Sequence, residues 1–368
     1  MTTTSRAVVL FATVLHGLPT MAAERWVAPR QPGGHCEAPV FGPDAESLAY
    51  SLNDHQSRRV ETLLVPLATG VPEAVTVGGS GPSAPAAFGS RSVSVVHGIT
   101  FAPATALTFR NQYVVSASDG GGQFDLYSSQ ARAPLAPAPG HDGDAAWNPV
   151  NEAQVIFSSA RTGEGDLYLL DFQTPDVPRR ITQLDGSAEV DVAWSPDGQS
   201  IAYVAHSSAG DNVWVLDDLH GSEPRRLTAN AATQVRPQWA PIGEPRIAFY
   251  QYTQGAAEKL DRVDLMISTP QGGVRKIAEG VIADSRGPSW TPDGASLIVV
   301  LDDASRFDPV ASVDARTGEV TVLPTGTVGN ADLSVGATRD GRVLLAVCAQ
   351  GRDGDAQRDF RRAFLLNL

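Results

Sequence analysis

The sequence contains very little lysine. Lysine occurs only at Lys259 and Lys276, so arginine supplies nearly all of the positive charge, and the formal net charge is −13 at pH 7. Nucleic acids and anionic membrane surfaces attract proteins through a basic face. The charge therefore argues against nucleic acid and anionic membranes as partners.

Long apolar runs are absent as well. A helix needs about 20 consecutive apolar residues to cross a bilayer, and no segment of the sequence reaches that length. The apolar residues 7–15 follow Arg6, are broken by Gly17 and Pro19, and lead to small residues near Ala23. This pattern predicts a signal peptide over residues 1–23. We therefore expect a periplasmic or secreted protein without membrane insertion.

Motifs that bind metals and cofactors are missing too. The sequence contains no Cys-x-x-Cys, His-Glu-x-x-His or Gly-x-Ser-x-Gly pattern, and the glycines at 120–122 do not precede a helix. Zinc sites, phosphate loops and hydrolase nucleophile elbows need these patterns. We therefore predict no catalytic residue, no metal and no cofactor.

A repeated module is what the sequence does contain. Residues 194–203 read W-S-P-D-G-Q-S-I-A-Y, residues 290–299 read W-T-P-D-G-A-S-L-I-V, and weaker copies start at Phe41, Trp147 and Trp239. Each copy is a strand ending in an aromatic residue, a tight turn favoured by Pro and Gly, and a second apolar strand. Third and fourth strands, the latter with Arg-Arg-Ile-Thr or Arg-Arg-Leu-Thr, complete a propeller blade.

The spacing of these modules predicts an all-β, closed β-propeller of four-stranded blades. Successive anchor residues lie 45 to 60 residues apart, which suits propeller blades: Phe41, Phe101, Trp147, Trp194, Trp239, Trp290 and Ala337. We favour seven blades over six, in one domain over residues 24–368. The last unit lacks a fourth strand, and residues 24–29 could supply it, so strands from both termini would close a monomeric ring.

The two cysteines agree with this closure. Cys36 enters the first strand of the first blade and Cys348 ends the second strand of the last blade. Both places lie on the same face of neighbouring blades, and an exported protein can pair its cysteines. We predict a Cys36–Cys348 disulfide, and two buried free thiols are the alternative.

At these residues the sequence resembles the TolB-type propeller repeat, a WD-like repeat with a W-S-P-D-G turn. The resemblance covers about residues 36–368 and is strongest in the units at Trp147, Trp194 and Trp290. It implies an exported propeller, often one that binds proteins. The same repeat precedes the hydrolase domain of prolyl oligopeptidase relatives, an activity that is not implied here without the nucleophile motif.

Candidate binding residues are the polar ones that vary at equivalent places in the first strands. Alternation along a strand turns them away from the anchor, toward the central channel or its mouth. The ligand-binding candidates are Asp144, Asp191, Arg236, Glu189, Gln234 and Asp332. A merely hydrated channel is the alternative.

Three functions remain open from the sequence. The first is a non-enzymatic module that docks a protein or peptide at the channel mouth. The second is a metal-assisted lyase or lactonase, which requires His35, His141 and His206 to converge, and His55 falls in a loop on the same predicted face. The third is a carbohydrate binder, which requires exposed aromatic side chains on the rim.

Overall fold

The computed structural model describes ten segments of the chain. These are residues 23–27, 34–54, 59–75, 94–110, 112–118, 123–130, 133–252, 262–303, 307–352 and 360–368. They form 27 strands and one short 3-10 helix, Pro43–Ala45, so the predicted all-β class is confirmed. The proposed signal peptide, except for Ala23, and His55 lie outside the described residues.

Two sheets contain the beginning and the end of the described chain. The order β1-β27-β26-β25 joins Ala23–Val27, Arg362–Asn367, Val343–Arg352 and Thr327–Ala337. The next sheet has the order β2-β3-β4-β5, with bounds Gly34–Phe41, Ser47–Asp54, Arg59–Pro66 and Glu73–Ala74. Strand β1 therefore pairs with the last strand of the chain, and β2 contacts β25 and β26.

Three further sheets follow in chain order. Strands β6-β7-β8 span Ser94–Phe101, Tyr113–Ser118 and Asp125–Ser128. Strands β9 to β12 span Asp142–Trp147, Gln154–Ser159, Asp166–Asp171 and Arg179–Arg180. Strands β13 to β16 span Ser187–Trp194, Ile201–Ser207, Asn212–Leu216 and Arg225–Arg226.

The remaining sheet has eight strands and repeats the same plan twice. Its first half is β17 to β20, with bounds Gln234–Trp239, Ile247–Tyr252, Arg262–Thr269 and Gly272–Ile282. Its second half is β21 to β24, with bounds Ser289–Trp290, Ser296–Leu301, Val310–Asp314 and Val320–Val322. The end of β20 pairs with β22 and joins the halves.

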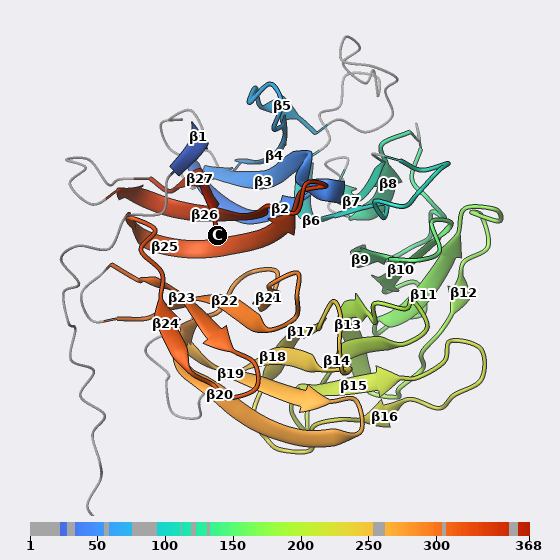
Figure 1. Ribbon diagram of the computed structural model, residues 1–368. Coiled ribbons are helices and arrows are strands. Elements are labelled where there is room, and N and C mark those ends of the chain that lie inside the picture. The colour runs from blue at the N-terminus through green and yellow to red at the C-terminus, as the bar shows by residue number, and fades with distance from the viewer. Residues whose placement is uncertain are drawn as a thin grey trace, which may run out of the picture.

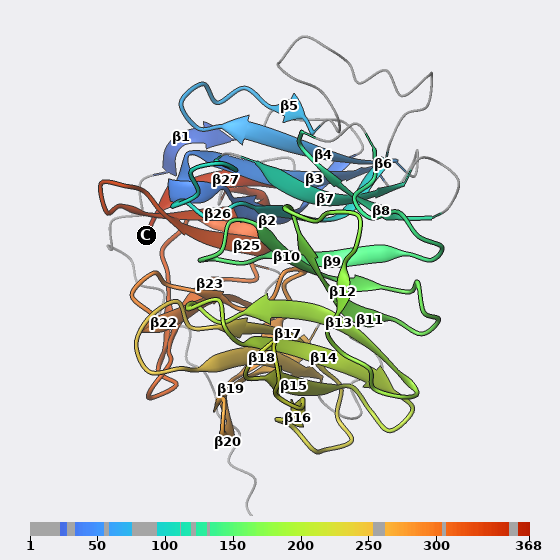
Figure 2. The same ribbon diagram turned by 90° about the vertical axis from the view of Figure 1, so that its right-hand side faces the viewer.

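The sheets follow one another around the molecule, and the strands that lie toward the middle are β2, β6, β9, β13, β17, β21 and β25 (Figure 1). Figure 2 shows the same body from the side on which β9 to β16 lie. Hydrophobic clusters combine residues of neighbouring sheets, such as Ile156 and Leu167 with Ile201 and Tyr203. The core therefore lies between sheets, and the indole of Trp194 bridges two of them by donating to the Ala146 carbonyl at 3.0 Å.

The W-S-P-D-G turn forms as the sequence predicts. Gly198 has φ of +68°, and its N–H donates to the Ser195 carbonyl at 2.9 Å. The Ser195 hydroxyl accepts from the Ser200 N–H at 2.9 Å. A residue with a side chain would be strained at this φ, and a Cβ on Gly198 would lie 2.3 Å from the Asn148 amide oxygen. Glycine is therefore required here on two counts.

Candidate functional site

The inner strands surround a cavity of about 820 Å³. Its wall is shared by residues of β2 to β4, β6, β7, β9, β10, β13, β14, β17 and β18, and by the segment before β21. Acidic, basic and hydroxyl side chains all face it. Mixed polar lining in a cavity of this size suits a ligand that is recognised by specific polar contacts.

A bulge recurs three residues before the anchor in the first strands and shapes this wall. Ala38, Asp144, Asp191 and Arg236 have φ between +47° and +56°, and Gly98 has +50° at the equivalent place. The pairing with the second strand shifts at the same positions. All five residues line the cavity. Three of the candidates, Asp144, Asp191 and Arg236, thus come together in one site.

Glu189 and Gln234 do not face the cavity, contrary to the prediction. Both are completely buried. Glu189 accepts from the hydroxyls of Ser187 at 2.7 Å and Thr182 at 3.1 Å, and Gln234 accepts from Thr228 at 2.8 Å. A bulge inserts a residue and turns the preceding side chains to the other side of the strand. Simple alternation therefore fails five residues before the anchor.

The carboxyl group of Glu189 has a strongly shifted acidity. Burial raises its pKa to about 7, and the nearby Asp166 carboxylate acts in the same direction. The hydrogen bonds from Ser187 and Thr182 and the charge of Arg180 oppose this shift. Because Glu189 has no access to the cavity, its shifted pKa belongs to the packing of its sheet.

Asp332 occupies the place that sequence numbering gave to Ser334. The pairing of β25 with β26 shifts between Asn330 and Leu333. Val335 takes the anchor position, and it pairs with the buried Leu345 on β26. The ladder continues for two residue pairs beyond Val335, to Ala337 opposite Val343, and Asp332 lies three residues before Val335 without the positive φ of the other bulges. Asn330 takes the fully buried place that Glu189 and Gln234 hold elsewhere.

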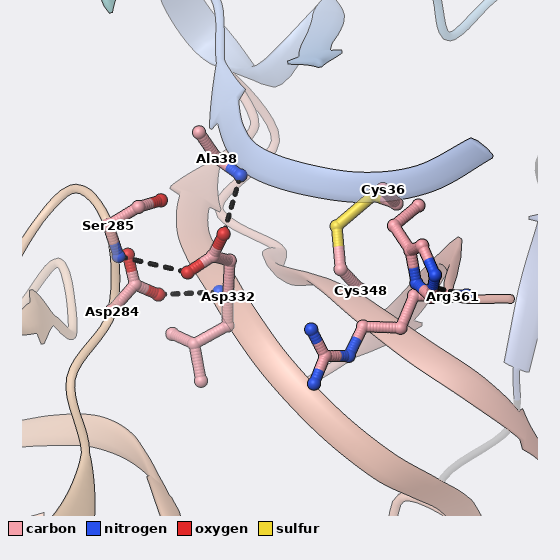
Figure 3. Close-up of a disulfide and its surroundings, with 9 residues drawn as sticks. Cys36, Ala38, Asp284, Ser285, Asp332, Cys348 and Arg361 are labelled. Carbon is pink, nitrogen blue, oxygen red and sulfur yellow. Dashed lines mark hydrogen bonds between the residues drawn. A yellow bond between two sulfur atoms is a disulfide. The ribbon is translucent and has the colours of Figure 1, made fainter. Parts of the chain in front are cut away.

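The carboxylate of Asp332 joins three sheets (Figure 3). It accepts from the N–H of Ala38 at 2.8 Å and from the N–H of Ser285 at 2.9 Å. Asp191 makes the equivalent contact between β13 and β17, because it accepts from the N–H of Arg236 at 3.0 Å. Asp332 does not line the cavity, and its role in the structure is to hold the wall together.

The predicted disulfide is present beside this contact. Cys36 and Cys348 are bonded, their Cα atoms are 5.4 Å apart, and neither residue is exposed to solvent. Figure 3 shows the bond between β2 and β26, close to Ala38 and Asp332. The bond and the carboxylate therefore hold the same pair of sheets.

Arg236 extends the chain of contacts toward the segment before β21. Its guanidinium lies 4.0 Å from the Asp191 carboxylate and donates to the carbonyl of Ser285. The amide of Gln238 donates to the carbonyl of Arg286 at 3.0 Å. Arg286 also lines the cavity and was not predicted. Arg286 lies four residues before its anchor, Trp290. It is the one arginine at this place of the repeat, where other units have Glu37, Gly143, Val190 and Val235.

The three histidines of the metal hypothesis lie in two different places. His141 and His206 line the cavity, whereas His35 packs on the ring of Phe360. Nδ1 of His206 lies 2.9 Å from the Asp211 carboxylate. Among the residues that the structure describes, no three His, Cys, Asp or Glu side chains are arranged to hold a metal ion. In the same residues no helix has the length and apolar character needed to cross a membrane.

Comparison with known proteins agrees with this architecture. A family model described as the TolB beta propeller domain matches residues 85–264 and 123–334, which together are more than half of the chain. The chain belongs to the TolB beta-propeller domain family. The resemblance inferred from the W-S-P-D-G repeat is thereby confirmed.

Curated relatives of this TolB-like propeller carry names of different kinds. Tricorn protease homolog 1 of Streptomyces coelicolor is 30% identical over 231 residues, 55% of this chain and 21% of that protein. The chain spans about a fifth of the length of the curated relatives it matches. Their names include a protease, a peptidase and a Tol-Pal system protein, so they leave open whether this propeller acts as an enzyme.

Solved structures share the fold at low sequence identity. A putative TolB from Agrobacterium tumefaciens has a TM-score of 0.50 and 22% identity, covering 72% of this chain and 89% of that one. A puromycin-hydrolyzing peptidase of Mycobacterium tuberculosis has a TM-score of 0.56 and 13% identity, covering 88% and 54%. At such identities the likeness concerns the fold alone.

Proposed function

We propose that this propeller is a non-enzymatic binding module that docks a protein or peptide at the mouth of its cavity. The observation that carries the proposal is the bulge position. Gly98 shows that a residue without a side chain satisfies the backbone there, yet Asp144, Asp191 and Arg236 take it despite their positive φ. Strained residues that carry charge into a cavity are typical of functional sites.

We further propose that seven groups of strands form one closed ring around the cavity. Counting the eight-stranded sheet as two units gives seven groups, whose inner strands are β2, β6, β9, β13, β17, β21 and β25. The pairing of β1 with β27, the contact of β2 with β25 and the Cys36–Cys348 bond support closure between the first and last groups. A ring of six blades would not account for one of these seven groups.

Export to the periplasm or beyond the cell is part of the same proposal. Disulfides persist in oxidising compartments and are rare in the cytosol, and the bond between Cys36 and Cys348 supports such a location. The predicted signal peptide over residues 1–23 agrees with it. The proposed module is a monomer that needs no cofactor.

The lyase or lactonase hypothesis gains no support from the histidines. It needs His35, His141 and His206 around one ion, and His35 packs against Phe360 rather than lining the cavity with the other two. The carbohydrate hypothesis is also less favoured. Of the cavity-lining residues, only Phe124 and Tyr252 offer a six-membered aromatic ring.

Affinity capture tests the binding function. The mature chain is immobilised and exposed to native envelope extract, and the retained proteins are identified and titrated. We expect saturable retention that is lost in Arg236→Glu and Asp191→Arg. Arg316→Glu is the matched control, because Arg316 is exposed outside the cavity. Absence of saturable retention, or equal retention by all three variants, would contradict the proposal.

A further inference from the structure

The segment before β21 brings two polar residues into the cavity wall. Ser285 and Arg286 line the cavity. Gly287 follows with φ of +100°, and a Cβ there would lie 2.9 Å from the carbonyl oxygen of Arg236. Glycine thus allows this segment to lie directly against β17. As a result the side chains of Arg236, Ser285 and Arg286 belong to one part of the cavity.

The guanidinium of Arg286 has donors left for a ligand. Among the described residues its one hydrogen bond is from Nη2 to the Ile99 carbonyl, at 2.9 Å. An arginine side chain carries five N–H donors. Removal from water lowers the pKa of Arg286, the Asp284 carboxyl opposes this, and the nearby charge of Arg236 lowers the pKa further. An anion beside both arginines would relieve their repulsion.

Two neighbouring carboxylates, those of Asp284 and Asp332, are directed to the backbone, whereas that of Asp191 lies 4.0 Å from the Arg236 guanidinium. Asp332 accepts from the main-chain N–H groups of Ala38 and Ser285, and Asp284 accepts from those of Leu333 at 2.6 Å and Arg286 at 2.8 Å. These acidic side chains thus serve the backbone of the wall. Their hydrogen bonds leave the free guanidinium donors of Arg286 available to another acceptor.

Ser285 supplies an independent indication. Its Oγ is buried and has no hydrogen-bond partner among the described residues. A buried hydroxyl without a partner destabilises the folded protein, and native structures contain few such groups. The residue lines the cavity, so rotation about its Cα–Cβ bond brings the buried hydroxyl to a ligand atom.

We propose that Arg236, Ser285 and Arg286 form a subsite for a carboxylate group of the ligand. The inference rests on the proposed binding function and specifies its chemistry. A planar guanidinium holds a carboxylate through two parallel hydrogen bonds, and the Ser285 hydroxyl donates a third. The carboxylate is either the C-terminus of a peptide or that of a side chain or small molecule.

Acetyl-glycyl-glycine and its C-terminal amide are the probes that test this subsite. The chain is labelled with 15N-arginine, and the Nε–Hε signals of Arg236 and Arg286 are assigned with Arg→Gln variants. We expect saturable shifts with the free acid and none with the amide. The expected Kd is about millimolar, as for a gain of about 4 kcal/mol. Equal shifts with the amide, or no saturation with any carboxylate, would overturn the subsite.

Glutarate distinguishes the sources of the carboxylate. Binding as tight as that of acetyl-glycyl-glycine supports the subsite and assigns it to a side-chain or small-molecule carboxylate. Binding of the peptide acid alone supports the subsite and assigns it to a chain terminus.

Ser285→Ala separates binding from folding. It removes no internal hydrogen bond, so the free energy of unfolding should not fall, whereas affinity for the free acid should fall about tenfold, as expected for a hydrogen bond to a charged group. Arg286→Gln should weaken binding at least as much, and Arg316→Gln should not. Unchanged affinity in Ser285→Ala and Arg286→Gln would overturn the subsite even if envelope capture succeeds. Carboxylate binding without capture would instead overturn only the protein-docking function.

Discussion

At the scale of the residue, two positions of the repeat, three and five residues before the anchor, have different roles. Three residues before the anchor, side chains reach the cavity and vary between Asp144, Asp191 and Arg236. Five residues before it, Glu189 and Gln234 accept hydrogen bonds from threonines at the end of the fourth strand. We therefore expect substitutions three residues before the anchor to change ligand binding, and substitutions five residues before it to change the packing of the sheet.

Glu189 should make stability depend on pH. In the unfolded chain its carboxyl ionises near 4.5, whereas in the folded protein burial raises the pKa to about 7. Between these values the folded state binds more protons, so the free energy of unfolding falls as pH rises from about 4.5 to 7. We expect Glu189→Gln to remove about 2–3 kcal/mol of this fall. Denaturant unfolding from pH 4.5 to 8 measures it.

Burial also raises the pKa values of Asp142 and Asp284. Their contributions have the same sign, so the variant should keep part of the decline. Identical pH profiles of the Gln variant and the native chain would contradict the assignment.

At the scale of the element, the bulge is the feature that the sequence predicts least well. The repeat itself predicts strands and turns, because Trp194, Pro196 and Gly198 act through local conformation and packing. The bulge depends on pairing with the second strand, and no residue type marks it, since Ala38, Gly98 and Asp144 all adopt it. This explains why Asp144, Asp191 and Arg236 were placed correctly and Glu189 and Gln234 were not.

The longer ladder of β25 and β26 is a second feature that the sequence does not predict. The turn at residues 338–341 is recognisable, but no residue type marks the number of residue pairs before it, and β25 and β26 pack against β22 and β23. The spacing therefore predicts Asp332 five residues before the anchor, whereas in the structure it lies three residues before Val335. There its carboxylate accepts hydrogen bonds from the N–H groups of Ala38 and Ser285.

Replacement of Ala38 by glycine tests the bulge. Its φ of +48° is unfavourable for a residue with a Cβ, by about 1–2 kcal/mol, whereas glycine adopts it freely. We expect Ala38→Gly to raise the free energy of unfolding by about 0.5–1 kcal/mol, after the entropy of the more flexible unfolded chain is included. Ala146→Gly, at ordinary strand geometry in β9, should lower it. A loss in both variants would argue against the left-handed conformation.

At the scale of the whole molecule, the two ends of the chain meet in one place. Strand β1 pairs with β27, Cys36 is bonded to Cys348, and Asp332 accepts the N–H of Ala38. The sequence separation of the cysteines is 312 residues, so the bond restricts almost the entire unfolded chain. Such a bond is worth about 6 kcal/mol in the chain-entropy description.

Cys36→Ser should therefore lower the melting midpoint strongly under oxidising conditions. Cys348→Ser and the double Cys→Ser variant should lower it by the same amount, because each change removes the same bond. Differential scanning calorimetry of the three variants with the native chain checks this. An unchanged midpoint in Cys36→Ser would mean that the bond contributes nothing to closure.

The ladder between β20 and β22 has a consequence for how the molecule opens. Val281 pairs with Leu301 and Ile282 with Val300, which joins strands β17 to β24 in one continuous sheet. Amide hydrogens in both halves should therefore exchange with solvent as one cooperative unit. Partial opening should begin elsewhere, at a boundary where separate sheets meet mainly through side chains.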